Sequence, residues 1–183
     1  MCTDERKNIM VNNETIENLI SRRSVRSFSS KPVPEDILDT ILEAGKYAPS
    51  GMDRQPTAMV VVTDNDRISG LSMLNAAVMG ANTDPFYGAP VIVIVFADST
   101  VPTYMEDGAL VMGNLLNAAH ALGVDSCWIH RAKEVFETED GKALKRRWGL
   151  DDKYVGIGNC ILGYSDKPVP SAKPRKDGRV IFD

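Results

Sequence analysis

The chain has few of the residues that build metal centres or disulfide frameworks. Among its 183 residues there are three cysteines, Cys2, Cys127 and Cys160, and two histidines, His120 and His130. No cysteine pair has CxxC spacing, which argues against a zinc or iron–sulfur site. A sparse, odd cysteine count is typical of a reducing compartment. We therefore expect a cytoplasmic protein without a bound metal.

Long apolar segments and an excess of basic residues are also missing. The longest apolar run, Val91 to Ala97, is far shorter than the roughly 20 residues that a membrane-spanning helix needs. The N-terminal sequence MCTDERKNIM is polar and lacks the apolar core of a signal peptide. The net charge of −4 argues against a general nucleic-acid-binding protein. We expect neither a membrane nor a nucleic acid among its partners.

What is present is the composition of a single soluble domain. The chain is 43% hydrophobic and 25% charged, and its length suits one core. No repeat, low-complexity tract or linker divides it. We expect a flexible leader over residues 1–13 and one domain over residues 14–183.

Periodicity alone predicts a mixture of helices and strands. Helices are expected over residues 15–21, 34–48, 65–73, 106–122 and 134–148, the last with a break near Gly141. Strands are expected over residues 59–63, 91–97, 126–129 and 154–163. Residues 75–89 give no clear signal.

Two basic stretches lie at opposite ends of the chain. Their phosphate-binding candidates are Arg22, Arg23, Ser24 and Arg26 in SRRSVRSF, and Lys173 and Arg175 near the C-terminus. Guanidinium groups match phosphate oxygens bidentately, and a lysine adds a point charge. If folding brings the stretches together, they form a phosphate clamp. If it does not, they are solvated surface charge, and the residues alone leave both interpretations open.

Four segments, taken in order, resemble the nitroreductase family of flavin enzymes. They are RRSVRSF after the opening helix, PVPEDILDTILEAGKYAPSGMDRQP before an apolar strand, GNLLNAAHALG leading into VDSCWI, and GIGNCILGYSDKPVP before KPR. The resemblance covers roughly residues 14–178. It implies an α+β fold with a central, mainly antiparallel sheet flanked by helices, in an intertwined homodimer. It also implies that FMN lies at the dimer interface and that residues 168–183 dock on the partner subunit.

The resemblance implies several further contacts to the flavin. A loop from the other subunit would contribute Pro49, Ser50, Gly51, Asp53 and Gln55. The Ile129–His130 corner would give a backbone N–H to flavin N5, and Asn82 would bond near the pyrimidine edge. Arg26 would be a cation that tunes the flavin potential, and no other catalytic residue is expected.

Two positions depart from the family pattern. Asp53 stands where many members have Asn; it would oppose charge on the reduced flavin, accept from a ribityl hydroxyl, or pair with Arg54. His130 and Arg131 stand where many members have a small residue, and His130 is either a proton donor or an incidental loop residue.

The implied function is transfer of reducing equivalents from NADH or NADPH through flavin N5 to a nitroaromatic, quinone or enone, by a ping-pong mechanism. The alternative is a flavin-binding storage or sensor protein of the same fold with little reductase turnover. Flavin breakdown, dehalogenation or heterocycle oxidation is less favoured, because the short chain shows no large inserted lid.

Overall fold

The fold is built around one strand, β2 (Val91–Asp98), in the computed structural model of this chain, which describes residues 11–183. Every residue of β2 from Val91 to Ala97 is buried. β-branched side chains suit such a strand, because both of its faces are covered. Most of the leader expected over residues 1–13 lies outside the described residues.

Four antiparallel strands form the sheet, in the order β1-β2-β4-β3. The other three strands are β1 (Thr57–Val62), β3 (Asp125–Ile129) and β4 (Tyr154–Gly163). The register between β2 and β4 shifts at Val95 and Phe96, which pair with Gly158 and Gly156. The expected antiparallel sheet is confirmed, and β3 forms one of its edges.

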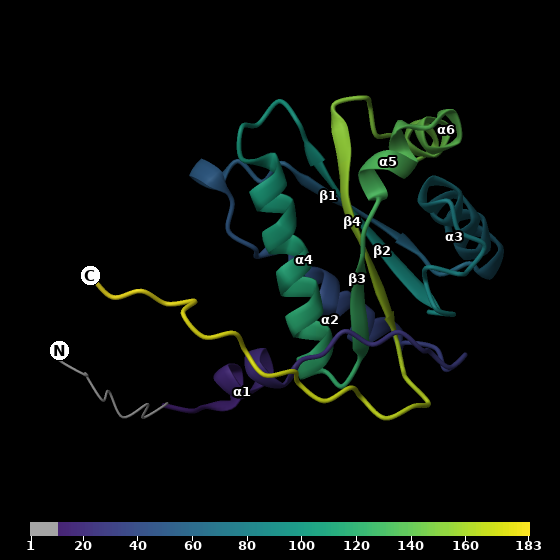
Figure 1. The fold of residues 1–183 in the computed structure, drawn as a ribbon. Helices are drawn as coiled ribbons and strands as arrows, with labels where there is room; N and C mark the ends of the chain where they lie inside the picture. Colours follow the sequence, from purple (N-terminus) through teal and green to yellow (C-terminus); the bar gives the residue numbers. More distant parts are fainter. Residues whose placement is uncertain (1–10) are drawn as a thin grey trace.

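Helices cover both faces of this sheet. They are α1 (Glu14–Ser21), α2 (Glu35–Lys46), α3 (Asn65–Met79), α4 (Tyr104–Ala121), α5 (Ala132–Glu137) and α6 (Glu139–Arg147). Figure 1 shows α2 and α4 on one face and α3, α5 and α6 on the other. Successive side chains of a strand point to opposite faces, so Val93 packs with the first group and Ile94 with the second. The expected α+β architecture is confirmed. No helix among residues 11–183 is long and apolar enough to cross a membrane.

The expected helix over residues 134–148 is two helices, so a break exists in the expected region, but Gly141 itself lies inside the second helix. The break falls at Thr138, whose hydroxyl accepts from the Gly141 N–H at 3.1 Å and caps α6. Gly141 is buried inside α6, where a Cβ would collide with the Val135 carbonyl oxygen. The glycine therefore allows α5 and α6 to approach closely.

The uncertain segment 75–89 begins inside α3, which is longer than expected. α3 ends at Gly80, whose φ of 67° is the left-handed conformation that terminates many helices. At the other end of the chain, residues 164–183 contain no helix or strand. Figure 1 shows this tail running away from the end of β4 toward the side of α1.

Candidate functional site

Arg22, directly after α1, has a buried guanidinium nitrogen without a partner. Its backbone N–H donates to the Asn18 carbonyl at 3.2 Å and closes the helix. Its Nη1 atom has no hydrogen-bond partner within the described residues. A buried charged donor is costly unless an acceptor meets it. The geometry therefore suits an anion at this position.

A second unpaired polar atom lies on the neighbouring strand. Ser24 forms a parallel bridge with Ser126 of β3, and the Val25 N–H donates to the Ser126 carbonyl at 3.0 Å. Ser126 is 2% exposed, and its hydroxyl oxygen has no partner among residues 11–183. The turn that carries Arg22 is thus paired through Ser24 and Val25 with the strand that carries the second unsatisfied polar group.

Arg23 is engaged differently from Arg22. Its Nη1 donates to the backbone carbonyls of Ile20 and Arg22, both at 2.7 Å. These bonds satisfy carbonyls at the C-terminal end of α1. Arg23 therefore shapes the turn, while the Arg26 side chain is exposed.

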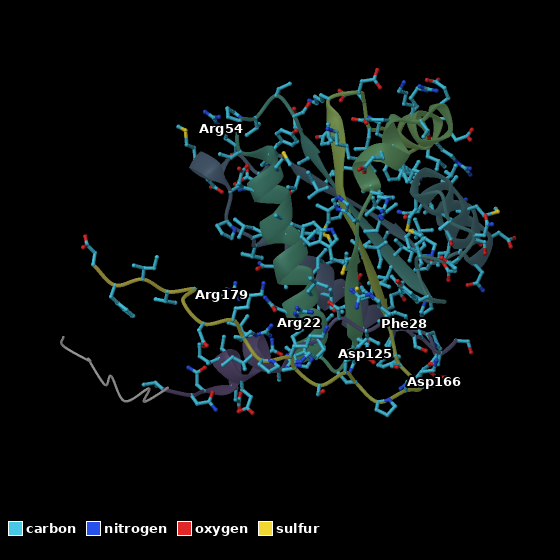
Figure 2. The ribbon with its side chains drawn as sticks, viewed as in Figure 1. Arg22, Phe28, Arg54, Asp125, Asp166 and Arg179 are labelled. Atoms are coloured by element: carbon cyan, nitrogen blue, oxygen red, sulfur yellow. The ribbon has the colours of Figure 1, made fainter. Side chains whose placement is uncertain are left out.

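The chain leaving β4 packs against the first basic stretch. The N–H and the hydroxyl of Ser29 donate to the Tyr164 carbonyl at 2.8 and 2.9 Å, and the Ser27 hydroxyl donates to Asp166 at 3.4 Å. In Figure 2 the tail runs from Asp166 across the view below Arg22 to Arg179. The fold thus brings the start of the tail beside SRRSVRSF. Among residues 11–183, no hydrogen bond joins Lys173 or Arg175 to Arg22.

The predicted flavin loop, residues 49–55, is held by α4. The Gly51 N–H donates to Oδ1 of Asp107 at 2.9 Å, and the Thr103 hydroxyl donates to Oδ2 at 2.8 Å. Asp107 is 3% exposed, so its carboxylate is largely shielded from water. The carboxylate therefore fixes the loop to the first turn of the helix.

Three non-glycine residues of this loop have left-handed backbones: Met52, Asp53 and Gln55, with φ of 55°, 54° and 47°. Such conformations are costly and concentrate at functional sites. The Gln55 amide donates to Oδ1 of Asp53 at 2.9 Å, while Arg54 contacts the Met52 sulfur. Asp53 thus accepts from Gln55, and not from Arg54.

The loop and the phosphate-binding candidates lie at opposite ends of α4. Ser21 bonds His120 in the last turn of this helix, whereas Gly51 bonds Asp107 in its first turn. At 1.5 Å per residue, the 18 residues of α4 span about 27 Å. Figure 2 shows Arg54 near one end of α4 and Arg22 near the other. One chain therefore does not bring these two sets together.

The corner after β3 is fixed by a buried asparagine. The Asn75 amide donates to the His130 carbonyl at 3.1 Å, and its own Oδ1 is buried without a partner in the described chain. Carbonyl and N–H point in opposite directions across a trans peptide. Because the His130 carbonyl faces α3, the Arg131 N–H faces away from α3. Arg131 has a φ of 73°, a conformation that glycine adopts more easily.

Asn82 lies apart from these groups. It lines a cavity of about 830 Å³ between α3 and the loop that follows it, and neither Arg22 nor His130 borders this cavity. Asp84 orders the loop by accepting from the Ser72 hydroxyl and from the Gly88 N–H, at 2.6 and 2.7 Å.

Sequence reasoning missed three polar residues that organise the site: Asn75, Asp107 and Ser126. Asp107 offered a signal, since it stands four residues before Val111, a buried apolar residue of α4, and so lies on the same helix face. A carboxylate on a buried helix face needs partners, which Gly51 and Thr103 supply. Asn75 belongs to the segment 75–89, which has no clear hydrophobic periodicity. Ser126 lies in an expected strand, and nothing in the sequence sets it apart from other strand residues.

Comparison with known proteins agrees with this fold. The Nitroreductase family model matches residues 19–164. A Methanothermobacter thermautotrophicus protein named as an NADH dehydrogenase/NAD(P)H nitroreductase is 28% identical over 175 residues, which cover 93% of this chain and 83% of the relative. An NADPH-flavin oxidoreductase of Vibrio harveyi is 27% identical over 180 residues, covering 92% and 72%.

A solved structure shares nearly the whole architecture. The nitroreductase with bound FMN from Bacteroides fragilis superimposes with a TM-score of 0.87 at 28% identity, covering 94% of this chain and 100% of the other. The sheet, the flanking helices and the matched span define an α+β protein of the nitroreductase fold. The chain belongs to the nitroreductase family.

Proposed function

We propose that this protein is an FMN-dependent oxidoreductase that passes reducing equivalents from NADH or NADPH to a small nitroaromatic, quinone or enone acceptor by a ping-pong mechanism. The observation that carries the proposal is the buried Nη1 of Arg22, which has no hydrogen-bond partner among residues 11–183. Two relatives support it by name, one as an NAD(P)H nitroreductase and one as an NADPH-flavin oxidoreductase. We propose that this activity takes place in the cytoplasm, because a sparse, odd cysteine count is typical of a reducing compartment.

In this proposal the FMN phosphate lies between Arg22 and the edge of β3. Nη1 of Arg22 and the Ser126 hydroxyl would each donate to a phosphate oxygen. Neither atom has a hydrogen-bond partner among residues 11–183. Ser24 adds a hydroxyl beside them, and Lys173 and Arg175 close the site from the tail. Arg23 holds the turn by its bonds to backbone carbonyls.

The flavin ring would extend from this phosphate along β3 toward the His130 corner. FMN, when bound, supplies the two-electron redox chemistry. The Asn75 amide holds the His130 carbonyl against α3, so that the Arg131 N–H is available to the ring. The exposed Arg26 adds a positive charge at the pyrimidine side. Asn82, which lines the separate cavity beside α3, is not placed in this site.

The distance between the loop and Arg22 supports a homodimer. Antiparallel packing of two α4 helices would place the loop of one subunit, at the start of its α4, beside the partner's Arg22, near the end of the other α4. An exposed face of α4 suits such packing: Met105 and Leu110 are 59% and 45% exposed, and a Cβ at Gly113 would meet no atom within 4 Å. The exposed tail, residues 168–183, would then dock on the partner subunit.

Anaerobic reduction of the purified protein tests the proposal. We expect a yellow protein with one FMN per chain, whose flavin absorbance is lost on addition of NADH or NADPH and returns with a nitroaromatic or quinone. A protein that binds no FMN contradicts the proposal. Bound FMN that stays oxidised in excess NADH and NADPH instead favours the storage or sensor function.

A further inference from the structure

A groove of about 470 Å³ separates α3 from α6. This volume is that of a site for a small organic molecule. The groove is lined by Arg67, Gly70, Leu71, Leu74, Asp140, Ala143, Leu144, Arg147 and Trp148. Figure 1 shows both helices on the sheet face opposite α2 and α4. None of the phosphate-binding candidates borders the groove.

The two helices present matching stripes to this groove. On α3 the lining residues recur at i, i+3, i+4 and i+7 from Arg67, and on α6 they do so from Asp140. In both stripes the second position is small and the third is leucine: Gly70 with Leu71, and Ala143 with Leu144. The result is an apolar floor between charged ends.

Two features show that the floor is open. Trp148 is half-buried, with its ring packed edge-on to Phe96 and tilted against Phe136, so its remaining surface faces the groove. Gly70 is inside α3, where glycine is a poor helix former, yet a Cβ there would meet no atom within 4 Å. Close packing therefore does not require this glycine, and its lack of a side chain widens the groove.

The charge at the rim is mainly positive. Arg67 and Arg147 are both exposed, and the structure gives neither an ion pair within residues 11–183. Asp140 is the single acidic residue of the lining. On a protein of net charge −4, two unpaired guanidiniums beside an apolar floor are complementary to an anion with an apolar body.

We propose that the groove between α3 and α6 binds a small aromatic carboxylate. The ring lies on the apolar floor formed by Leu71, Leu74, Leu144 and Trp148. The carboxylate accepts from Arg67, Arg147 or both. Asp140 opposes the ligand, which limits its affinity. This site is independent of the proposed flavin chemistry.

Calorimetric titration of the FMN-loaded protein with 2-naphthoate tests the site. We expect one 2-naphthoate per chain and binding of the neutral 2-naphthamide at least tenfold weaker. Arg67→Gln combined with Arg147→Gln should weaken 2-naphthoate binding at least tenfold, because it removes the charge-assisted contacts. Gly70→Leu should abolish binding by filling the groove, and Asp140→Asn should tighten it.

Arg146→Gln is the matched control, since Arg146 is exposed on the same helix but does not line the groove. It should leave the affinity unchanged, and circular dichroism should confirm that every variant is folded. The proposal is overturned if 2-naphthoate does not bind, if the amide binds equally well, or if the double arginine variant retains wild-type affinity.

Discussion

Replacement of Arg22 by methionine separates the phosphate contact from the packing of the side chain. A hydrogen bond to a charged group contributes about 1.5–3 kcal/mol, and each 1.4 kcal/mol is tenfold in affinity. Arg22→Met should therefore weaken FMN binding by about 10- to 150-fold. Quenching of FMN fluorescence on titration into apoprotein measures this change directly.

In the protein without FMN, the same substitution should not be destabilising. Because Nη1 of Arg22 is buried and unpaired, its removal breaks no hydrogen bond at that atom. The free energy of unfolding of the apoprotein should stay the same or rise, while the extra stability conferred by saturating FMN should fall with the lost affinity. Thermal unfolding with and without FMN distinguishes the two effects, and Arg146→Met serves as the control. Equal FMN affinity in Arg22→Met and wild type would refute the placement of the phosphate.

Three further outcomes are expected. Asp107→Ala should release the Gly51 loop and weaken FMN binding in the dimer, and fluorescence titration will show whether it does. Leu110→Asp should produce monomers, detected by analytical ultracentrifugation, because it buries a charge in the proposed α4 interface; a dimer that persists would place the interface elsewhere. The Thr100 hydroxyl holds the pKa of Asp98 below its ordinary value, so this contribution to stability is present above about pH 4 and is lost as the pH falls further. Thr100→Val should therefore reduce the loss of stability on acidification, and urea unfolding at several pH values tests this.

Local patterns in the sequence predicted most of the elements but not where two of them end. The apolar run of β2 and the periodic face of α4 are strong local signals, and both elements form as expected. Glycine is a poor helix former, so the sequence predicts a break near Gly141, yet the role of Gly141 is to let α5 and α6 approach. That role depends on a tertiary contact, which propensity does not contain.

The sequence indicated which residue types the candidate site contains, but not which hydrogen bonds each of them makes. The arginines of SRRSVRSF are compatible with an anion site or with solvated surface charge, and the buried Nη1 of Arg22, which has no partner among residues 11–183, favours the anion site. The sequence does not show that Arg23 binds the backbone carbonyls at the end of α1 while Arg22 keeps a free donor. This difference depends on the geometry of the two side chains. The Cys160 thiol lies on the sheet face that α2 and α4 cover. Burial raises the pKa of this thiol, which therefore stays protonated.

The affinity of the apoprotein for FMN relative to riboflavin tests the central claim most directly, because the two ligands differ only in the 5′-phosphate. If Arg22 and the basic tail converge on that group, FMN should bind at least 100-fold more tightly than riboflavin, as two charge-assisted contacts imply. Equal affinities would contradict the account, since they would show that the phosphate contributes nothing to binding.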